Sequence, residues 1–496
     1  MGFILAIDQG TTGTTAALID SKTFAFIDKA NLEYPQIYPQ PGWVEHDLDA
    51  IWKTVGESVR KVLEKNKTSA DQIVAIGITN QRETTCAFNT EGIPLAKAIV
   101  WQDRRTGDFC QELKDQGKES LIKEKTGLPI DPYFSGTKMR WLLNNNQDVK
   151  KAAAGNQLKF GNIDTFLLYK LSAGASYATE ASNASRTLLM DLKSSEWDSE
   201  LLSLFSVPLE CLPEIKDSFG DFGSTSGLDF LPDGIPITGI LGDQQAALFG
   251  QAGYSAGDMK CTYGTGAFIL INTGEELVRS SSGLLTTVAY KKEGQLYYAL
   301  EGAAYIAGAA VQWLRDNLKI IPNAPAVEAL AKEVKDLVEM ENIMMLPFFT
   351  GIGSPYWISD AQAALVGLTR DSGNSHIARA CLDGIALSIN DLIEAMGKDS
   401  GNKVKELKVD GGAVANDLLM TIQATVSQVK VIRPKVTETT AYGAALAAGI
   451  GANLIKFSQI SELWKEDSQF ESKSDEVEFY QRKAIQWKAT IQKLFL

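Results

Sequence analysis

The stretch ILAIDQGTTGTT, residues 4–15, decides the fold class. Its first four residues are apolar, as in a buried strand, and they lead through Asp8 into a turn of glycines and threonines. Glycine lets backbone N–H groups converge on an anion, threonine adds hydroxyl donors, and a neighbouring aspartate can hold Mg²⁺ through water. The segment therefore predicts either a phosphate-binding loop or a plain hairpin whose aspartate caps the turn.

A second carboxylate follows an apolar strand in PITGILGDQQA, residues 236–246, where Asp243 precedes a predicted helix. Asp243 is either the N-cap of that helix or a proton acceptor for a hydroxyl that attacks a phosphoryl group. Two carboxylates at the ends of well-separated strands favour the second interpretation.

Two further glycine segments lie in the second half of the chain. TYGTG, residues 262–266, leads into an apolar run much as residues 8–15 lead into residues 16–19, so it indicates either an internal repeat or a chance recurrence of a common hairpin. LKVDGGAVAN, residues 407–416, reads as strand, double glycine and helix start, where the backbone can approach a flat or anionic ligand. Neither a P-loop nor a Rossmann glycine pattern is present.

Composition narrows the class of protein. A chain of 496 residues exceeds the size of a single hydrophobic core, and short apolar runs between helical patterns predict two α/β domains. The net charge of −13 and the lack of a basic block argue against a nucleic-acid partner. Five scattered cysteines and two histidines indicate neither disulfides nor zinc, and no apolar stretch is long enough for membrane insertion, so we expect a cytoplasmic protein.

The last segment predicts an amphipathic helix. Its apolar residues recur every three or four positions, with Lys and Gln on the opposite face. The predicted apolar stripe consists of Tyr480, Ala484, Trp487, Ile491 and Leu494.

Two longer motifs carry a resemblance to a known family. DPYFSGTK at residues 131–138, and AALVGL at 363–368 with HIARACLD at 376–383, resemble the two signatures of the FGGY carbohydrate kinases, and the likeness covers nearly the whole chain. The resemblance implies a two-domain α/β fold of the actin, hexokinase and Hsp70 type (ribonuclease H-like), with a nucleotide cleft between the domains. It implies an N-terminal domain over residues 1–250, for polyol and phosphate binding, and a C-terminal nucleotide-binding domain over residues 251–496.

The resemblance also implies ATP and Mg²⁺ as cofactors. It makes Asp243 the catalytic base and assigns Mg²⁺ to Asp8 and Asp243. The implied nucleotide contacts are Thr11, Thr12, Gly13, Thr15, Thr265, Gly308, Gln312, Gly412 and Asn416. Many relatives have Ser-Ser-Arg where this chain has Gly13-Thr14-Thr15, so an arginine contact to the phosphates is either missing or supplied elsewhere.

The acceptor site resembles that of family members that phosphorylate glycerol. The motif NQRET, residues 80–84, supplies Arg82 and Glu83, whose donor fork and acceptor oxygens suit vicinal hydroxyls. The implied polar set is completed by Tyr133, Asp243 and Gln244, with Trp101 and Phe268 as an aromatic wall. When no such motif surrounds them, adjacent Arg and Glu residues are more often a surface ion pair, and Trp and Phe residues are more often part of the ordinary core.

The implied reaction transfers the γ-phosphoryl group of MgATP to glycerol, giving sn-glycerol 3-phosphate and ADP for glycerol uptake and catabolism. One alternative is a family member that acts on a ketopentose such as xylulose. Another is a nucleotide-dependent chaperone or sensor of the same fold without a small acceptor.

Members of the family are often homodimers or homotetramers. An arginine is absent from residues 234–236 and no histidine lies between His46 and His376, so neither sugar-bisphosphate inhibition nor histidine phosphorylation is expected.

Overall fold

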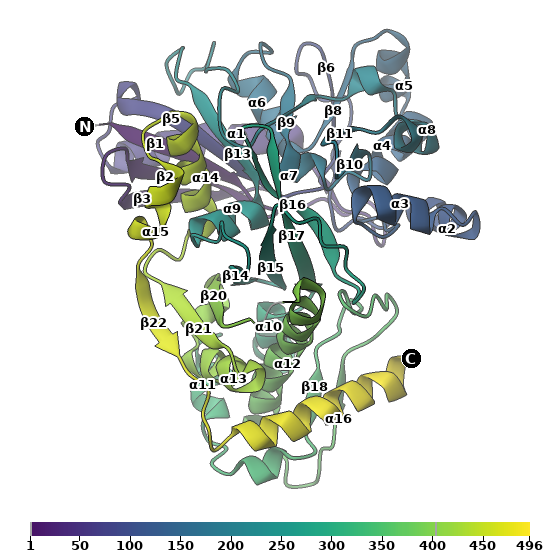
Figure 1. The fold of residues 1–496 in the computed structure, drawn as a ribbon, viewed down its shortest axis with the longest axis vertical. Coiled ribbons are helices and arrows are strands. Elements are labelled where there is room, and N and C mark those ends of the chain that lie inside the picture. The colour runs from purple at the N-terminus through teal and green to yellow at the C-terminus, as the bar shows by residue number, and fades with distance from the viewer. Residues whose placement is uncertain (1, 402–403) are drawn as a thin grey trace.

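The computed structural model describes residues 2–401 and 404–496, which form two lobes, each built on a mixed β-sheet (Figure 1). The sheet of the first lobe has the strand order β13 (Ile237–Gly242), β5 (Ile73–Asn80), β1 (Phe3–Gln9), β2 (Gly13–Asp20) and β3 (Phe26–Glu33). The second sheet has the order β16 (Leu285–Lys292), β17 (Gln295–Ala304), β15 (Ala267–Gly274), β14 (Met259–Tyr263), β20 (Glu406–Asp410), β21 (Lys430–Pro434) and β22 (Glu466–Phe470). The predicted two-domain α/β fold is confirmed.

The two sheets repeat one topology. Along β3, β2, β1, β5 and β13 the successive pairings are antiparallel, antiparallel, parallel and parallel. The same succession runs along β17, β15, β14, β20 and β21. The similarity between residues 8–15 and 262–266 therefore marks an internal repeat, since both segments form the first hairpin of their sheet.

Parallel pairing brings the sequence motifs to one edge of each sheet. Strands β1, β5 and β13 run in the same direction, so Asp8, the motif at residues 80–84 and Asp243 come to the same edge of the first sheet. In the second sheet β14 and β20 are parallel, so residues 264–266 and the double glycine at 411–412 likewise share an edge. The chain can therefore assemble one site from segments far apart in sequence.

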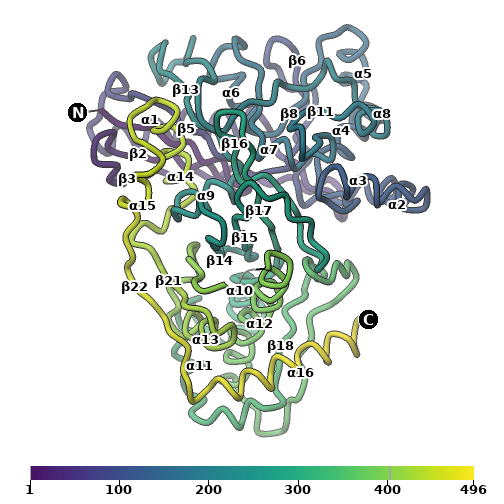
Figure 2. The backbone as a smooth tube through the Cα atoms, in the orientation of Figure 1, coloured from purple at the N-terminus to yellow at the C-terminus, as the bar shows by residue number. Residues whose placement is uncertain are grey.

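Helices from both halves of the chain cover the first sheet. Helix α1 (Leu48–Lys65) packs on one face, and α14 (Thr439–Gly451) packs on the other against alternate residues of β1 and β2. Glycine at position 77 allows this contact, because a Cβ there would lie 2.1 Å from the carbonyl oxygen of Ala444. Figure 2 shows this late segment lying among the early strands, so residues 439–451 pack with the first lobe although they belong to the second half of the sequence.

The C-terminal helix is α16 (Val477–Phe495), and its buried face differs from the predicted stripe. Tyr480, Trp487 and Ile491 are buried, but Leu494 is 46% exposed. Lys483, which lies three residues after Tyr480 and four before Trp487, is 1% exposed, and its ammonium donates to the carbonyls of Met340 and Ile343. Periodicity located the helix correctly, whereas it could not show that a lysine would find buried carbonyl partners.

The remaining elements complete the two lobes. The other helices are α2 (Gly107–Asp115), α3 (Glu119–Thr126), α4 (Ser135–Asn145), α5 (Gln147–Ala154), α6 (Ile163–Leu171), α7 (Ala181–Ala184), α8 (Ser199–Phe205), α9 (Asp243–Gly250), α10 (Gly308–Asp316), α11 (Ala326–Ala331), α12 (Asn374–Ser400), α13 (Asp417–Ser427) and α15 (Ile460–Leu463). Short strands are β4 (Glu45–His46), β6 (Cys86–Asn89), β7 (Ala98–Ile99), β8 (Leu158–Gly161), β9 (Ala178–Glu180), β10 (Met190–Asp191), β11 (Glu196–Trp197), β12 (Glu214–Lys216), β18 (Met344–Leu346) and β19 (Ala364–Val366). Across residues 2–401 and 404–496, no helix combines the length and apolar character needed to cross a bilayer.

Candidate functional site

In the turn between β1 and β2, the backbone carbonyl groups point toward Tyr34, the residue that follows β3. The hydroxyl of Tyr34 donates to the carbonyls of Gly10 and Thr11, both at 2.7 Å, and its amide donates to that of Thr12 at 3.3 Å. In a trans peptide the N–H points opposite to the C=O, so the amides of Thr11, Thr12 and Gly13 are directed away from Tyr34. Because Thr11 and Thr12 are accessible, this turn can present donors to an anion.

The turn between β14 and β15 is held in a similar way by the start of α10. The carbonyl of Gly264 accepts from the amide of Gly308 at 2.9 Å, and that of Thr265 accepts from the amide of Ala307 at 2.8 Å. The turn that carries Thr265 therefore meets the start of α10 at Gly308, and Gln312 lies exposed one turn further along α10. The amide of Thr265 points away from these contacts, by the same peptide geometry.

The two glycines after β20 have different surroundings. Gly411 has a φ of +93°, and a Cβ there would lie 2.5 Å from the carbonyl oxygen of Tyr263, so only glycine fits. At Gly412 an added Cβ would meet nothing within 4 Å. Asn416 caps α13 by accepting from the amide of Leu419 at 2.9 Å. Packing thus explains Gly411 but not Gly412, which borders open space.

Asp8 and Asp243 interact at the edge of the first sheet. Burial, followed by the negative charge of Asp243, raises the pKa of Asp8 to about 8. Burial also raises the pKa of Asp243, although the positive charge of Arg82 opposes this, and the Asp243 side chain remains 27% exposed. A cation between two such carboxylates would relieve their repulsion.

These carboxylates fit Mg²⁺. Within the described ranges, no three or more His, Cys, Asp or Glu side chains are grouped as a metal site. Mg²⁺, however, usually keeps several waters and binds through only one or two carboxylates. The donor set of Asp8 and Asp243 therefore suits this ion.

Thr15 accepts a hydrogen bond from the side-chain amide of Asn31 on β3 at 2.9 Å. Lys29, two residues away on the same strand, forms an ion pair with Glu438 just before α14. Its positive charge lowers the pKa of Asp8, against the larger effects of burial and of Asp243. The negative charge of Glu438 raises the same pKa by more, so the ion pair does not give this part of the site a net positive charge.

Arg82 and Glu83 are buried and do not form a surface ion pair. Arg82 is 2% exposed, and its Nε lies 3.0 Å from an oxygen of Asp243. Glu83 is 1% exposed and has a φ of +60°, a conformation uncommon outside glycine. Burial raises the pKa of Glu83 even though Arg186 and Arg82 oppose it. A positive φ outside glycine and buried charges are features that cluster at functional sites.

An aromatic group lies beside this pair. The ring centroid of Trp101 lies 5.6 Å from that of Tyr133 and 6.2 Å from that of Phe268. The indole Nε1 of Trp101 donates to the hydroxyl of Thr11 at 2.9 Å. Trp101 therefore joins the aromatic group to the first glycine turn, and Phe268 brings a residue of the second sheet to it.

Lys138 fixes the segment that carries Tyr133. Its ammonium donates to the carbonyls of Pro132, Tyr133 and Phe134 at 2.7, 2.6 and 3.2 Å. Burial lowers the pKa of Lys138 to about 7. The lysine of the first signature thus acts on the backbone next to the acceptor-side residues.

Gln244 accepts a hydrogen bond from Lys260, a residue that the sequence analysis did not identify. The Gln244 side-chain oxygen accepts from the ammonium of Lys260, which is buried in β14 and also donates to the Thr262 hydroxyl at 2.9 Å. Gln244 therefore connects α9 of the first lobe to β14 of the second.

Sequence reasoning also missed Arg186 and Glu301, which contact Arg82 and Glu83 directly. Glu301 is the only acidic residue in the apolar strand β17, and a lone charge in such a run is a signal that could have identified it. Arg186 carries no comparable signal, because it lies in an irregular segment after α7.

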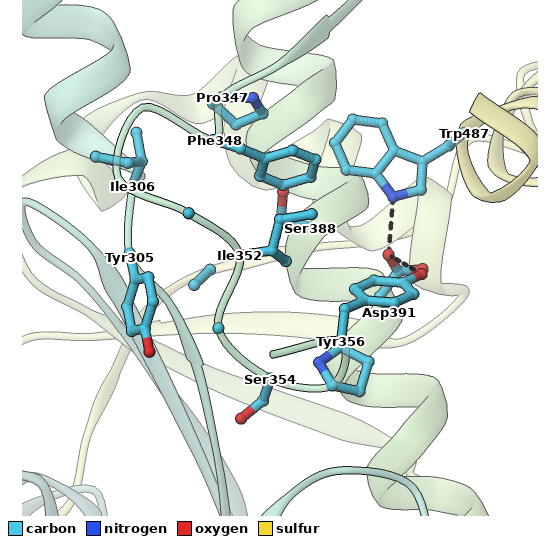
Figure 3. Close-up of a pocket in the computed structure, with 14 residues that line it drawn as sticks. Tyr305, Ile306, Pro347, Phe348, Ile352, Ser354, Tyr356, Ser388, Asp391 and Trp487 are labelled. Atoms are coloured by element: carbon cyan, nitrogen blue, oxygen red, sulfur yellow. Dashed lines mark hydrogen bonds between the residues drawn. The ribbon is translucent and has the colours of Figure 1, made fainter. Parts of the chain in front are cut away.

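A separate small cavity lies in the second lobe, between residues 347–356, α12 and α16 (Figure 3). Asp391 there accepts from the indole of Trp487 at 2.8 Å and from the hydroxyl of Tyr356 at 3.0 Å. Its space of about 20 Å³ suits a single water rather than a nucleotide. This cavity is therefore not the site described above.

Comparisons with known proteins agree with the geometry. Residues 3–250 match the model of the N-terminal domain of the FGGY family of carbohydrate kinases, and residues 259–452 match that of its C-terminal domain. The chain is 48% identical over 495 residues to a glycerol kinase of Myxococcus xanthus, covering 99% of both chains. It is 50% identical over 474 residues to a glycerol kinase of Bdellovibrio bacteriovorus, covering 95% of both.

Solved structures give the same result. The glycerol kinase of Plasmodium falciparum, crystallised with ADP, superposes with a TM-score of 0.91 at 35% identity, covering 100% of this chain and 99% of that one. A xylulose kinase of Lactobacillus acidophilus superposes with a TM-score of 0.88 at 22% identity, covering 100% of this chain and 98% of that one. The second likeness shows the fold alone.

Proposed function

Because the chain belongs to the FGGY family of carbohydrate kinases, we propose that it transfers the γ-phosphoryl group of ATP to glycerol, giving sn-glycerol 3-phosphate and ADP. The observation that carries this proposal is the identity of 48–50% over nearly the full chain to proteins named glycerol kinase. Since the reaction draws on the nucleotide pool of the cell, we place it in the cytoplasm.

The acceptor is held by the buried pair and its aromatic neighbours. Arg82 donates to one hydroxyl of glycerol and Glu83 accepts from its neighbour, with Tyr133 and Gln244 completing the polar contacts. Trp101 and Phe268 pack against the carbon chain. Buried donors and acceptors in fixed positions reject analogues that lack a hydroxyl, because the site groups would then remain unpaired.

Transfer of the phosphoryl group follows from this placement. The terminal hydroxyl oxygen of glycerol forms a bond to the γ-phosphorus, and the bond from that phosphorus to the oxygen it shares with the β-phosphate breaks, releasing ADP. Asp243, at the start of α9, accepts the proton of the attacking hydroxyl. Closure of the two lobes would exclude water, which otherwise competes as acceptor.

The two glycine turns hold the nucleotide. The first turn contributes Thr11, Thr12, Gly13 and Thr15 to the phosphates, and Thr265 contributes from the opposite lobe. Gly412 and Asn416 line the adenosine end, and Gly308 and Gln312 are further nucleotide contacts. Mg²⁺, held by Asp8 and Asp243 through water, would neutralise charge on the phosphates.

An acceptor panel tests the proposed function. Coupled ADP release is measured with MgATP and glycerol, dihydroxyacetone, xylulose or no acceptor. We expect glycerol to give the highest kcat/KM, because the site pairs a donor fork with an acceptor carboxylate over a short aromatic wall. Preference for xylulose would keep the family and change the substrate. Release that is independent of any acceptor would support a nucleotide-dependent sensor instead.

Replacing Gly412 by Val tests the nucleotide site. We expect KM for ATP to rise at least about tenfold while KM for glycerol and the melting temperature stay unchanged, because the new side chain fills open space rather than the core. Gly107→Val is the matched control, since a Cβ at Gly107 also meets nothing within 4 Å and lies in α2. An unchanged KM for ATP in Gly412→Val would remove this position from the nucleotide site.

A further inference from the structure

The acceptor-side pair is part of a closed ring of charged side chains. Glu301 accepts from Nη2 of Arg82 and from Nη2 of Arg186, both at 3.0 Å. Nε of Arg186 donates to Glu83 at 2.5 Å, and Glu83 follows Arg82 in the chain. Glu301 therefore orients Arg82, and Arg186 orients Glu83.

The ring is fully buried and balanced in charge. Arg82, Glu83, Arg186 and Glu301 are each at most 2% exposed. Burial favours the neutral acid at Glu301, but Arg186 and Arg82 outweigh it and lower the pKa of Glu301. Buried ion pairs seldom contribute more stability than apolar residues of the same volume, because desolvation offsets their attraction. The ring is therefore better explained by orientation than by stability.

Two buried donor nitrogens of the ring, among the described residues, make no hydrogen bond: Nε of Arg82, which lies 3.0 Å from an oxygen of Asp243, and Nη1 of Arg186. The Arg186 guanidinium lies 5.6 Å from the ring centroid of Tyr133, and it also contacts Glu83. An unsatisfied buried N–H costs about 1–3 kcal/mol unless a ligand or water accepts from it. The guanidinium that carries Nη1 of Arg186 thus lies next to Tyr133 and Glu83, two residues assigned to the acceptor, and also 5.4 Å from the ring centroid of Phe134.

We propose that Arg186 is a specificity-determining residue whose Nη1 donates to a hydroxyl of the polyol acceptor, and that Glu301 is a positioning residue that orients Arg186 and Arg82. This inference rests on the proposed function. It makes acceptor recognition depend on both halves of the chain, because Glu301 lies on β17 of the second sheet while the other three residues come from the first half.

Two substitutions test the proposal. Glu301→Gln removes the charge that holds both arginines, and Arg186→Lys keeps the positive charge but loses the planar fork that reaches Glu83 and Glu301 together. We measure kcat/KM for glycerol and for 1,3-propanediol, which lacks the central hydroxyl. In both variants we expect the preference for glycerol to fall at least about tenfold, with KM for ATP within about twofold of wild type.

The preference is a ratio, so a reduced amount of folded enzyme does not change it. Asp383→Asn is the matched control for Glu301→Gln, because Asp383 is a 1% exposed carboxylate that pairs with Arg379 on α12. It should lower the melting temperature without changing the preference. A preference equal to wild type in Arg186→Lys and Glu301→Gln would overturn the inference. Wild-type enzyme without glycerol-dependent ADP release would overturn the proposed function itself.

Discussion

Replacing Asp243 by Asn is expected to lower kcat for glycerol phosphorylation by about 10³-fold while glycerol still binds. Asparagine has nearly the same shape, and its side-chain oxygen can still accept from the amide of Gln244, as Asp243 does at 2.7 Å. It cannot, however, take the proton of the attacking hydroxyl. Turnover is measured by coupled ADP release at saturating glycerol and ATP, and glycerol binding by titration calorimetry.

The matched control is Asp475→Asn, which makes the same chemical change at an exposed position. It should leave both kcat and binding at wild-type values. Retained turnover in Asp243→Asn would remove Asp243 from the role of base. Loss of glycerol binding together with turnover would make Asp243 a binding residue.

Arg82→Met is expected to reduce kcat/KM for glycerol by about 10³-fold and to destabilise the protein by about 3–5 kcal/mol. Methionine fills much of the volume but leaves Asp243 without the guanidinium at 3.0 Å, and Glu301 with Arg186 as its remaining ion-pair partner. Both carboxylates then lie in the protein with less compensating charge. Kinetics with glycerol and urea unfolding measure the two effects separately.

Arg379→Met separates recognition from stability. Arg379 is also buried, pairs with Asp383 at 3.1 Å and donates to the hydroxyl of Tyr480 at 2.6 Å, all in the second lobe. It should show a comparable loss of stability with KM for glycerol unchanged. If Arg82→Met bound glycerol as tightly as wild type, Arg82 would be a structural residue and not an acceptor contact.

Burial excluded the interpretation of Arg82 and Glu83 as a surface ion pair. A sequence cannot distinguish an exposed Arg-Glu pair from a buried one, since both read as adjacent charges. Arg82 and Glu83 are buried because β5 lies between β1 and β13, which places its carboxyl end inside the sheet edge rather than at the surface. The assignment of these residues to glycerol remains a proposal, and their burial and strained backbone support it.

The sequence by itself determined the strands, the turns that follow them and the family. Short apolar runs ending in Asp8, Asp243 or paired glycines are local patterns, and parallel pairing then brings their ends together. The shared turn chemistry of residues 8–15 and 262–266 left a repeat and a chance recurrence equally open, and the matching strand pairings of the two sheets decided for the repeat.

Only the tertiary structure decided which side chains face one another. Arg82 meets Glu301 across 219 residues of chain, and Arg186 meets Glu83 across 103. Helix α14 packs on a sheet formed mostly by the first third of the chain, and Lys483 finds buried carbonyls. Periodicity reports which face of an element is buried, but a partner is chosen by packing and by the need to pair buried charges, and these depend on the assembled fold.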